Sequence, residues 1–471
     1  MQERNEARFK EKAAELAEWV KAKNHFLLVY NHDADGISSG AITATALKRI
    51  GKSFSSKPLK QLYKEEIEKL KGKAENFIFV DFGSGQLGEL KKAFKTSFAV
   101  VDHHQTKEEE FKLHLNPMLF GVDGGSEISA AGTCYVLATA IDEKNSDLAA
   151  LAIVGAVGDM QESGGALQGF NRKILQEGIE AGVLEKKTDL RLYGRVSRPL
   201  VQFLQFSTNP IIPMLTGSEE KCIKFLSANG IELKQGEKWR SYNDLSGEEK
   251  KKLASALIVH MHSFNVEEWK IKELIGEVYT LPKEKSETPL SDAKEFATVL
   301  NSCGRHSKAE TALKVCMGNR KEAYTEALVL LAEHRKQLRE GIELMQQKGL
   351  EEKEHFYFFD TGNKIKDSII GIVAGMIYSS QTVAPIKPII ALSRTDDGDI
   401  KASGRATSEL TRRGLNLGKI FKEMEKEIGK GLEGGGHRIA AGVKFREELR
   451  EEFLEKLDKK IGEQLAGKIY K

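Results

Sequence analysis

The sequence predicts an α/β protein whose N-terminal part is a doubly wound parallel sheet. Three short apolar runs, His25 to Tyr30, Phe77 to Val80 and Phe98 to Val101, are each followed by acidic residues or by an Asp-His cluster. Runs that are apolar throughout are typical of strands buried on both faces. Residues 37–50 and 86–95 carry helical periodicity, which predicts βαβ units.

The rest of the chain predicts a helical middle region and a second, smaller α/β domain. A chain of 471 residues is too long for one ordinary core and long enough for two or three. The pattern is mostly helical and irregular from about 165 to 280, Lys283 to Pro289 has the composition of a linker, and residues 319–349 predict one long charged helix. We divide the chain into residues 1–165, 166–318, 319–350 and 351–471.

The last of these parts alternates strand and helix patterns. The expected elements are a strand at His355 to Phe359, a helix at Ser368 to Tyr378, a strand at Lys387 to Ser393, a strand ending near Arg405, a glycine loop at Glu433 to His437 and a final helix from about 446 to 463.

The net charge of the chain does not indicate a nucleic-acid partner. Lys and Arg exceed Asp and Glu by only 72 − 69 = 3, while hydrophobic residues make up 40% and charged residues 30% of the chain. A protein that grips nucleic acid in one local groove need not be basic overall. The near-balance therefore counts only weakly against nucleic-acid binding.

The cysteines and the N-terminus predict a cytoplasmic protein. Cys134, Cys222, Cys303 and Cys316 lie far apart, and no C-x-x-C pair indicates a zinc ribbon or a redox motif. The N-terminus has the pattern of a charged amphipathic helix rather than of a signal peptide. Nowhere do 18 apolar residues run together, so we expect no membrane partner.

The informative feature is the position of the carboxylates. Asp33, Asp35, Asp81 and His103 directly follow the three predicted strands, and Asp159 follows a further apolar run. Because the carboxyl ends of parallel strands meet at one edge of the sheet, we expect these side chains to converge. So many acids cannot crowd together unprotonated without a cation.

Carboxylates with one or two imidazoles favour Mn²⁺ or Mg²⁺. Two such ions about 3.5–4 Å apart, bridged by a shared Asp, activate a water and clamp a phosphoryl group during displacement. A single Asp after a strand is more often a helix N-cap or a turn residue, and Asp102-His103-His104 alone fits a surface turn. The joint pattern favours the metal site.

A second set of residues is suited to phosphate. Its members are Ser403, Arg405, Gly434, Gly435, Gly436, His437 and Arg438. Backbone N–H groups of a glycine loop can face a phosphate, and His or Arg can neutralise it. The loop is not a Walker motif, because Gly-Lys-Ser/Thr is absent. A tight turn for the glycines and a surface ion pair for Arg405 are the alternatives.

Together these motifs resemble the DHH phosphoesterases of the RecJ type. The resemblance rests on Asp33-Ala34-Asp35-Gly36, Val80-Asp81-Phe82-Gly83, Asp102-His103-His104, Ser129 to Thr133 after Asn116-Pro117, Gly158-Asp159, Asn301 to Arg305, Ser403-Gly404-Arg405 and Gly434 to Gly442. It covers nearly the whole chain. Among RecJ-like proteins, the compact length without an appended OB-fold region is similar to the archaeal type, some members of which associate with the GINS replication complex.

The resemblance implies a metal-dependent exonuclease on single-stranded DNA or RNA, in replication, repair or RNA processing. It implies Asp33, Asp35, Asp81, His103 and Asp159 as ligands of two ions, with Asp81 as the bridge. It further implies that Asp102 orients His103 and that His104 faces the scissile phosphate. It makes residues 351–471 a DHHA1-like substrate-binding domain. Asn31 departs from the acid typical of bacterial RecJ sequences, which leaves the metal occupancy or preference open.

Two other functions fit the same motifs. One is a phosphodiesterase for short oligonucleotides or cyclic dinucleotides, although such proteins tend to be shorter, and the extra helical region of roughly 165–350 suggests a longer substrate or a partner surface. The other is a GINS-binding replication scaffold with secondary nuclease activity, since the eukaryotic replicative helicase contains a DHH-derived subunit without catalytic ligands. Every ligand position is filled here, which argues against a purely structural role.

Overall fold

The computed structural model describes residues 2–106, 111–162, 164–207, 210–379, 384–395, 397–429 and 431–466. The chain forms two compact units, Met1–Leu331 and Ala332–Lys471, called here the first and the second unit. Their boundary falls within the long helix α14 (Glu322–Lys348), which confirms the helix predicted for residues 319–349. The four-part division of the chain stays a prediction.

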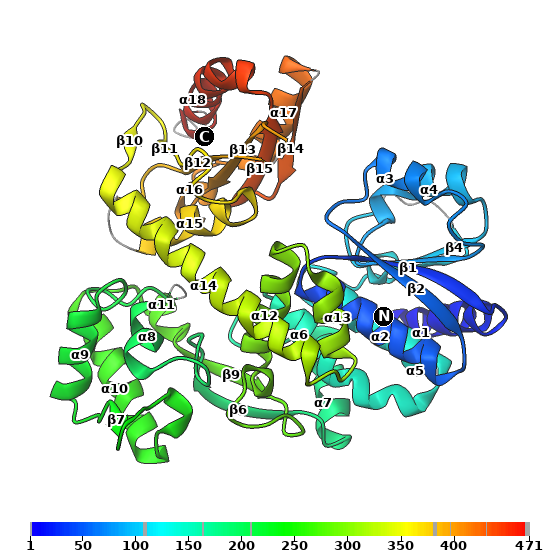
Figure 1. Cartoon of the computed structure of the whole chain (residues 1–471), viewed down its shortest axis with the longest axis horizontal. Coiled ribbons are helices and arrows are strands. Elements are labelled where there is room, and N and C mark those ends of the chain that lie inside the picture. The colour runs from blue at the N-terminus through cyan, green and yellow to red at the C-terminus, as the bar shows by residue number, and fades with distance from the viewer. Residues whose placement is uncertain are drawn as a thin grey trace. The chain divides into compact units, whose positions relative to one another are not determined.

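A five-stranded parallel sheet forms the centre of the N-terminal part of the first unit (Figure 1). Its order is β2-β1-β3-β4-β5, so β1 lies between β2 and β3 at the point where the strand order reverses. The three predicted strands are confirmed as β1, β3 and β4. The strands are β1 (His25–Asn31), β2 (Ser53–Leu59), β3 (Phe77–Val80), β4 (Phe98–Val101) and β5 (His114–Leu115).

Helices cover both faces of this sheet, as the continuous apolar runs predict. Alternate residues of β1, such as Leu28 and Val29, belong to two different core clusters. One face packs against α1 (Gln2–Lys21), α2 (Ala34–Arg49), α5 (Ala130–Ile141) and α6 (Ala149–Gly158). The other face packs against α3 (Lys64–Leu70) and α4 (Leu87–Phe94). The apolar run before Asp159 is thus a buried helix, α6.

A helical insertion with its own core follows α7 (Gly169–Glu180). Two antiparallel strands, β6 (Glu185–Leu190) and β9 (Ile275–Thr280), bring its two ends together. Between them lie α8 (Leu200–Gln205), α9 (Glu219–Ala228), β7 (Lys234–Gln235), β8 (Lys238–Trp239), α10 (Gly247–Ser263) and α11 (Glu268–Lys272). The mainly helical middle region is therefore confirmed.

The segment Lys283 to Pro289 is not a linker between domains. It lies inside the first unit, after β9, and Glu284 accepts a hydrogen bond from Arg320 at 2.9 Å. Its charged composition suits an exposed turn equally well, and the ion pair fastens it to the segment before α14. The linker prediction is wrong.

The helix α12 (Ala293–Arg305) returns the chain to the parallel sheet, followed by α13 (Ala309–Cys316). Its Asn301 side chain accepts a hydrogen bond of 2.9 Å from Ala34 N at the start of α2. Gly304 lies so close to the end of β1 that a Cβ added there would stand 1.7 Å from His32 O. This close approach requires glycine.

The second unit contains a mixed six-stranded sheet of order β10-β11-β12-β13-β15-β14. Its strands are β10 (Glu351–Glu352), β11 (Tyr357–Asp360), β12 (Ile389–Arg394), β13 (Ile400–Arg405), β14 (Leu432–Gly436) and β15 (Ala440–Phe445). Its helices after α14 are α15 (Asp367–Ser379), α16 (Ser408–Arg412), α17 (Leu417–Ile428) and α18 (Arg450–Ala466). The predicted strands, helix and final helix are confirmed.

The predicted glycine loop is wrong. Gly434, Gly435 and Gly436 belong to β14, an edge strand paired antiparallel with β15 through Gly435 opposite Gly442. His437 closes a tight turn, because its N–H donates to Ala440 O at 2.8 Å. Three glycines weaken a strand locally, but pairing with β15 supplies the missing order.

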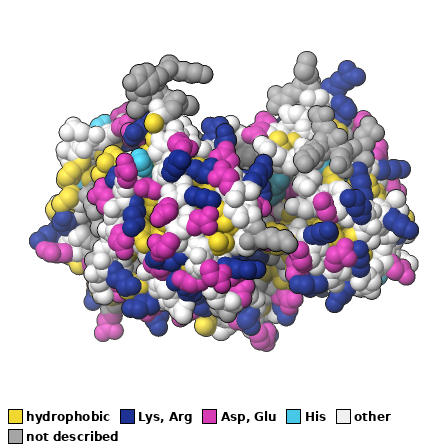
Figure 2. Space-filling view, turned by 90° about the horizontal axis from the view of Figure 1, so that it is seen from above, with side chains coloured by type: hydrophobic (Ala, Val, Ile, Leu, Met, Phe, Trp, Pro, Cys, Tyr) yellow, Lys and Arg dark blue, Asp and Glu magenta, His cyan; other side chains and the backbone are white. Residues whose placement is uncertain are grey.

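Figure 2 shows basic and acidic side chains interspersed over the visible face, in line with the near-balanced charge. Among the described residues, no helix combines the length and the apolar character needed to cross a membrane.

We predict that Gly304→Ala destabilises the first unit. The added methyl meets backbone atoms rather than a flexible side chain, and overpacking of this kind costs about 1–3 kcal/mol. The urea midpoint of unfolding, followed by circular dichroism, should fall. Gly88→Ala is the control, since Gly88 also lies on a helix but has open space at the Cβ position. Equal midpoints for the two variants would contradict the close approach.

Candidate metal centre

The first acidic pair lies at the junction of β1 and α2. Asp33 is the N-cap of α2 and accepts a hydrogen bond of 2.9 Å from Gly36 N. The capping interpretation is therefore correct for Asp33, and it leaves the second carboxylate oxygen facing Asn31 Nδ2 at 3.3 Å. Capping fixes the carboxylate at the carboxyl edge of the sheet without using all of its acceptor capacity.

Asp35 lies in the first turn of α2 and is 3% exposed. Its two carboxylate oxygens accept hydrogen bonds from Ala130 N at 2.8 Å and Ala131 N at 3.0 Å. These N–H groups are the first of α5, where the helix dipole favours a negative charge. Gly155 of α6 makes room, because a Cβ there would stand 2.5 Å from Asp35 Oδ1.

Asp81 follows β3 and is 2% exposed. Its backbone has φ = 63°, in the left-handed region that a non-glycine residue seldom adopts. Such strain persists only where the surroundings impose it, and it is common at functional sites. The conformation carries the carboxylate toward the end of β4.

His103 stands between the two buried acids. Its Nε2 lies 3.4 Å from Asp81 Oδ1 and 3.7 Å from Asp35 Oδ2. Its Nδ1 lies 2.7 Å from Gly124 O, and because a carbonyl only accepts, Nδ1 carries the proton. Nε2, which faces Asp35 and Asp81, is then unprotonated in the neutral ring and can bind a metal.

Asp102 does not orient His103, contrary to what the resemblance implies. Its Oδ1 lies 2.8 Å from Nδ1 of His104 and accepts from the backbone N–H of His103 at 2.8 Å. Its Oδ2 accepts from Ser84 N at 2.9 Å. The carbonyl of Gly124 orients the ring of His103, whereas Asp102 orients the ring of His104, whose side chain is 54% exposed.

Asp159 completes the cluster from the C-cap of α6. Its Oδ2 lies 3.9 Å from His103 Nδ1 and accepts a hydrogen bond of 2.8 Å from Gln161 Nε2. Within the described part of the chain, the ligand atoms of Asp35, His103 and Asp159 lie within 4.8 Å of one another, as do those of Asp81, His103 and His104. Asp33 is at the same edge but in neither group.

The pKa shifts in the cluster show that its carboxylates are difficult to ionise together without a cation. Burial raises the pKa of Asp35, and burial together with the charge of Asp33 raises the pKa of Asp81 well above its usual range. Burial and the charge of Asp35 raise the pKa of Asp159 to about 7. Burial opposes a charge on His103, but Asp81 and Asp35 outweigh it and raise the pKa of the imidazole well above 6.5.

The pair Asp102 and His104 behaves differently. Burial alone would raise the pKa of Asp102, but the hydrogen bond and charge of His104 hold it well below its usual range. Burial likewise opposes the charge on His104, yet the Asp102 hydrogen bond raises the pKa of His104 to about 9. An imidazolium beside the carboxylate cluster is suited to an anionic substrate.

The donor set of the cluster fits a divalent ion. Carboxylate oxygens and one imidazole nitrogen are ligands that Mn²⁺ and Mg²⁺ accept, and no thiolate is among them. The ligands converge from four elements, β1–α2, β3, β4 and α6, on the carboxyl edge of the sheet. The carboxylates repel one another, and binding a cation removes this penalty.

The predicted phosphate-binding residues of the second unit fall on neighbouring elements. Ser403 and Arg405 are two apart on β13 and both approach α15, where a Cβ on Gly371 would stand 2.4 Å from Arg405 Nη2 and 3.2 Å from Ser403 Oγ. His437 and Arg438 are exposed in the β14–β15 turn. Glycine at position 371 therefore leaves room for the Arg405 guanidinium beside α15.

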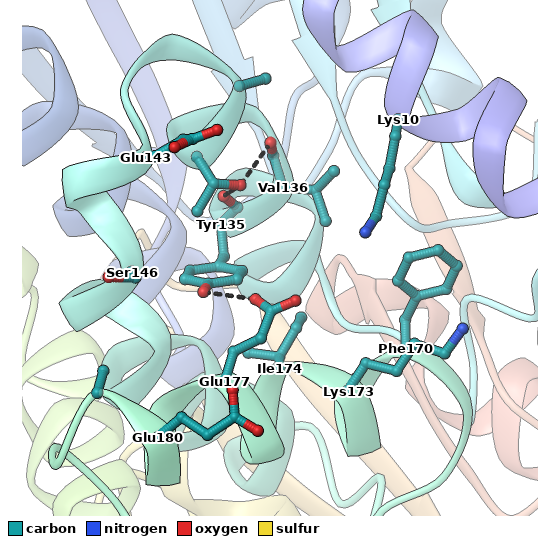
Figure 3. A pocket seen from close by; sticks show the side chains of 13 residues that line it. Lys10, Tyr135, Val136, Glu143, Ser146, Phe170, Lys173, Ile174, Glu177 and Glu180 are labelled. Atoms are coloured by element: carbon teal, nitrogen blue, oxygen red, sulfur yellow. Dashed lines mark hydrogen bonds between the residues drawn. The ribbon is translucent and has the colours of Figure 1, made fainter.

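A cavity of about 610 Å³ lies elsewhere in the first unit, between α1, α5, α7 and the short helix η3 (Glu143–Leu148) (Figure 3). Tyr135 donates a hydrogen bond of 2.7 Å to Glu177 on its wall, and Lys10 approaches from α1. None of the candidate ligands lines this cavity, so it is not part of the metal centre.

Comparisons with known proteins agree with this geometry. The model "DHH family, N-terminal domain" matches residues 26–156, the "DHH-CID domain" matches 192–275 and the "DHHA1 domain" matches 354–463. An uncharacterized protein of Methanocaldococcus jannaschii is 33% identical over 458 residues, covering 94% of this chain and 96% of that protein. The chain belongs to the DHH family.

Solved structures share the fold of this DHH protein. RecJ from Thermus thermophilus in complex with Mn²⁺ has a TM-score of 0.59 and 18% identity, and the match covers 96% of this chain but 54%, about half, of RecJ. An exonuclease RecJ bound to manganese has a TM-score of 0.59, with 17% identity and coverages of 98% and 97%. CDC45 from Entamoeba histolytica has a TM-score of 0.69, with 15% identity and coverages of 97% and 99%.

The structure explains two sequence features of this DHH protein. The motif Asn301 to Arg305 supports the start of α2, through the Asn301 bond to Ala34 N and the close approach of Gly304. Asn31, where the resemblance to bacterial RecJ sequences implies an acid, donates a hydrogen bond of 3.3 Å to Asp33 and carries no charge of its own.

Sequence reasoning missed Gly124 and Gln161. Gly124 supplies the carbonyl that holds His103, and a Cβ there would stand 1.9 Å from His103 O. Gln161 bonds Asp159, but neither a glycine in a turn nor an amide is a residue type that signals a metal site. Only its position two residues after Asp159 could have drawn notice.

We predict that Asp81→Asn stabilises the metal-free protein while abolishing its stabilisation by Mn²⁺. Removing one buried charge relieves repulsion, and a gain of about 1 kcal/mol corresponds to ~2–4 °C in melting temperature. For the unsubstituted chain, an ion at about 100 times its Kd should add roughly 2.7 kcal/mol. Differential scanning fluorimetry in EDTA and with Mn²⁺ measures both. Asp367→Asn, in the second unit, should leave the Mn²⁺ response unchanged; an unaltered response in Asp81→Asn would refute the assignment.

Proposed function

We propose that this DHH protein is a metal-dependent exonuclease that hydrolyses phosphodiester bonds of single-stranded DNA or RNA. The observation that carries the proposal is the position of His103, whose Nε2 lies between Asp35 and Asp81 at the carboxyl edge of the sheet. The fold shared with RecJ supports it. Roles in DNA replication, repair or RNA processing follow from the same resemblance.

In this proposal two Mn²⁺ or Mg²⁺ ions are held by Asp33, Asp35, Asp81, His103 and Asp159. Asp81 would be the ligand that both ions share, as the resemblance to RecJ implies, and its Oδ1 lies 3.4 Å from His103 Nε2. When bound, such ions generate a nucleophile from water and neutralise the charge on the phosphate. The surrounding residues hold the carboxylates in place and bury Asp35 and Asp81, whereas the side chain of Asp159 stays partly exposed.

His104 would then contact the scissile phosphate. Its ring is more than half exposed, oriented by Asp102, and cationic at neutral pH because its pKa is raised to about 9. A charge-assisted hydrogen bond from the imidazolium to a phosphate oxygen is stronger than a neutral one. Asp102, fully buried, acts by fixing this ring.

The second unit would hold the phosphates of the strand. The proposed contacts are Ser403, Arg405, His437 and Arg438, with the glycines of β14. An edge strand of glycines presents its backbone without side chains, so a phosphate can approach its N–H groups closely. Arg405 offers a planar guanidinium suited to phosphate oxygens.

A role as a partner-binding scaffold is the second candidate. The insertion, residues 192–275, exposes large apolar side chains, among them Trp239 at 50%, Val259 at 68% and Trp269 at 45%. Exposed aromatic side chains are common in protein interfaces. We propose that exposed side chains of the insertion contact a replication partner such as GINS. Co-elution with purified GINS, lost in Val259→Asp, would test this independently of nuclease activity.

The nuclease proposal predicts metal-dependent degradation of end-labelled single strands. Asp35 and Asp81 are only 3% and 2% exposed, so the phosphate must reach a recessed site, which a single strand does more readily than a duplex. Asp81→Ala should abolish cleavage because it removes a shared ligand. Rates on matched single- and double-stranded DNA and RNA, with Mn²⁺ and with Mg²⁺, measure this.

The exposed acid Glu220 provides the control, since Glu220→Ala removes a carboxylate from α9 and should cleave normally. Binding should weaken with salt at a log-log slope of about −0.7 per phosphate contacted. Near-normal cleavage by Asp81→Ala would disprove the metal assignment. Cleavage of cyclic dinucleotides alone would favour the small-substrate phosphodiesterase.

We predict that Arg405→Ala and His437→Ala weaken substrate binding but not Mn²⁺ binding. Each lost charged contact should cost about 1.5–3 kcal/mol, chiefly in KM if it is equally strong in ground and transition states. Steady-state kinetics and a Mn²⁺ titration measure the two effects. The matched control is Arg446→Ala, which removes an exposed arginine elsewhere in the second unit. Unchanged kinetics in both variants would contradict a phosphate-binding role for Arg405 on β13 and for His437 in the β14–β15 turn.

A further inference from the structure

Gln161 joins two of the candidate ligands with a single amide. It is 5% exposed, and its Nε2 donates to Asp159 Oδ2 at 2.8 Å and to Gly124 O at 2.8 Å. The same Gly124 carbonyl accepts from His103 Nδ1 at 2.7 Å. One nitrogen thus contacts the carboxylate of Asp159 directly and the ring of His103 through one carbonyl.

The orientation of this amide is determined by its neighbours. An amide nitrogen has two hydrogens, and both partners of Nε2 are pure acceptors. The Oε1 atom accepts a hydrogen bond of 2.5 Å from Asn171 Nδ2. Turning the amide over would place Oε1 against two acceptor oxygens and Nε2 against a donor, so only one orientation satisfies all three contacts.

Asn171 anchors the amide to the rigid part of the fold. It is fully buried in the first turn of α7, and its backbone N–H donates to Glu127 O at 2.8 Å. The backbone N–H of Gln161 donates to Ala156 O of α6 at 3.0 Å. The side chain of Gln161 is therefore held at both ends before any ligand binds.

We propose that Gln161 is a positioning residue for the metal centre, which sets the carboxylate of Asp159 and the ring of His103 at once. The inference rests on the metal site of the proposed function. A neutral donor suits this place, because Lys or Arg would compete with a cation and Glu would repel Asp159. Residues that orient metal ligands by hydrogen bonds typically change metal affinity by 10–100-fold when replaced.

The test is Mn²⁺ binding to the full chain, measured as free Mn²⁺ by electron paramagnetic resonance. Gln161→Met keeps the length of the side chain and removes both donors, and we expect Mn²⁺ to bind about 10–100-fold more weakly. Gln161→Asn keeps the amide but shortens it by one methylene, so it should also bind weakly. Gln176→Met is the matched control, since Gln176 donates to Glu180 on the exposed face of α7.

A double-mutant cycle separates positioning from general support of the fold. In an Asp159→Ala background, the further loss caused by Gln161→Met should shrink, because one of its two routes to the metal is gone. A merely structural Gln161 would lower the melting temperature without changing the Mn²⁺ Kd of the folded protein. A Kd within twofold of the unsubstituted chain in both folded Gln161 variants would overturn the proposal.

Failure of the proposed function would look different. If the unsubstituted chain binds Mn²⁺ with the expected dependence on Gln161 but cleaves no oligonucleotide, the positioning role stands and the nuclease function falls. If it cleaves single strands while Mn²⁺ affinity is indifferent to Gln161, the nuclease function stands and the positioning role falls.

Discussion

The repulsion among buried carboxylates at one sheet edge is the constraint on which the rest of the first unit depends. Asp35 and Asp81 are both buried, and the charge of Asp35 acts on Asp81. Among the described residues, no lysine or arginine forms an ion pair with either of them. The fold meets this penalty with backbone donors, most clearly the first two N–H groups of α5 on Asp35. Gly155 lets α6 pack closely against Ala131 of α5 and against Asp35, and Gly124 lets its own segment approach His103, so these glycines are a condition of the electrostatics rather than a separate feature.

The sequence was informative where burial imposes a pattern. Strands β1, β3 and β4 are apolar on both faces and were therefore recognisable, and the acids that follow them had to share one edge. Strand β2 (Ser53–Leu59) carries serines and a lysine, because it lies at the open edge of the sheet, and nothing in its local sequence distinguishes it from a loop. The glycines of β14 have no strand propensity at all, and only pairing with β15 orders them.

The sequence could predict that Asp35, Asp81, His103 and Asp159 lie together, but not how the groups around them orient their side chains. Which group orients which imidazole depends on the rotation of two adjacent rings. The resemblance implies that Asp102 orients His103, whereas Asp102 in fact lies against Nδ1 of His104. The carbonyl of Gly124 and the amide of Gln161 are groups that any sequence contains in abundance. They can orient Asp159 and His103 only because the fold places them within hydrogen-bonding distance of these side chains.

The insertion shows how a long sequence separation is compatible with a tight site. Asn301 is 267 residues from Ala34, yet it binds the first free N–H of α2 beside Asp33. The insertion falls between Asp159 and α12, and the pairing of Leu190 with Ile275 brings its two ends together. Because those ends are adjacent, α12 can return to the sheet whatever the length of the excursion, and loop-closure entropy rises only slowly with length. The site thus depends on the packing of α12 and tolerates a module that elaborates the surface without separating the ligands.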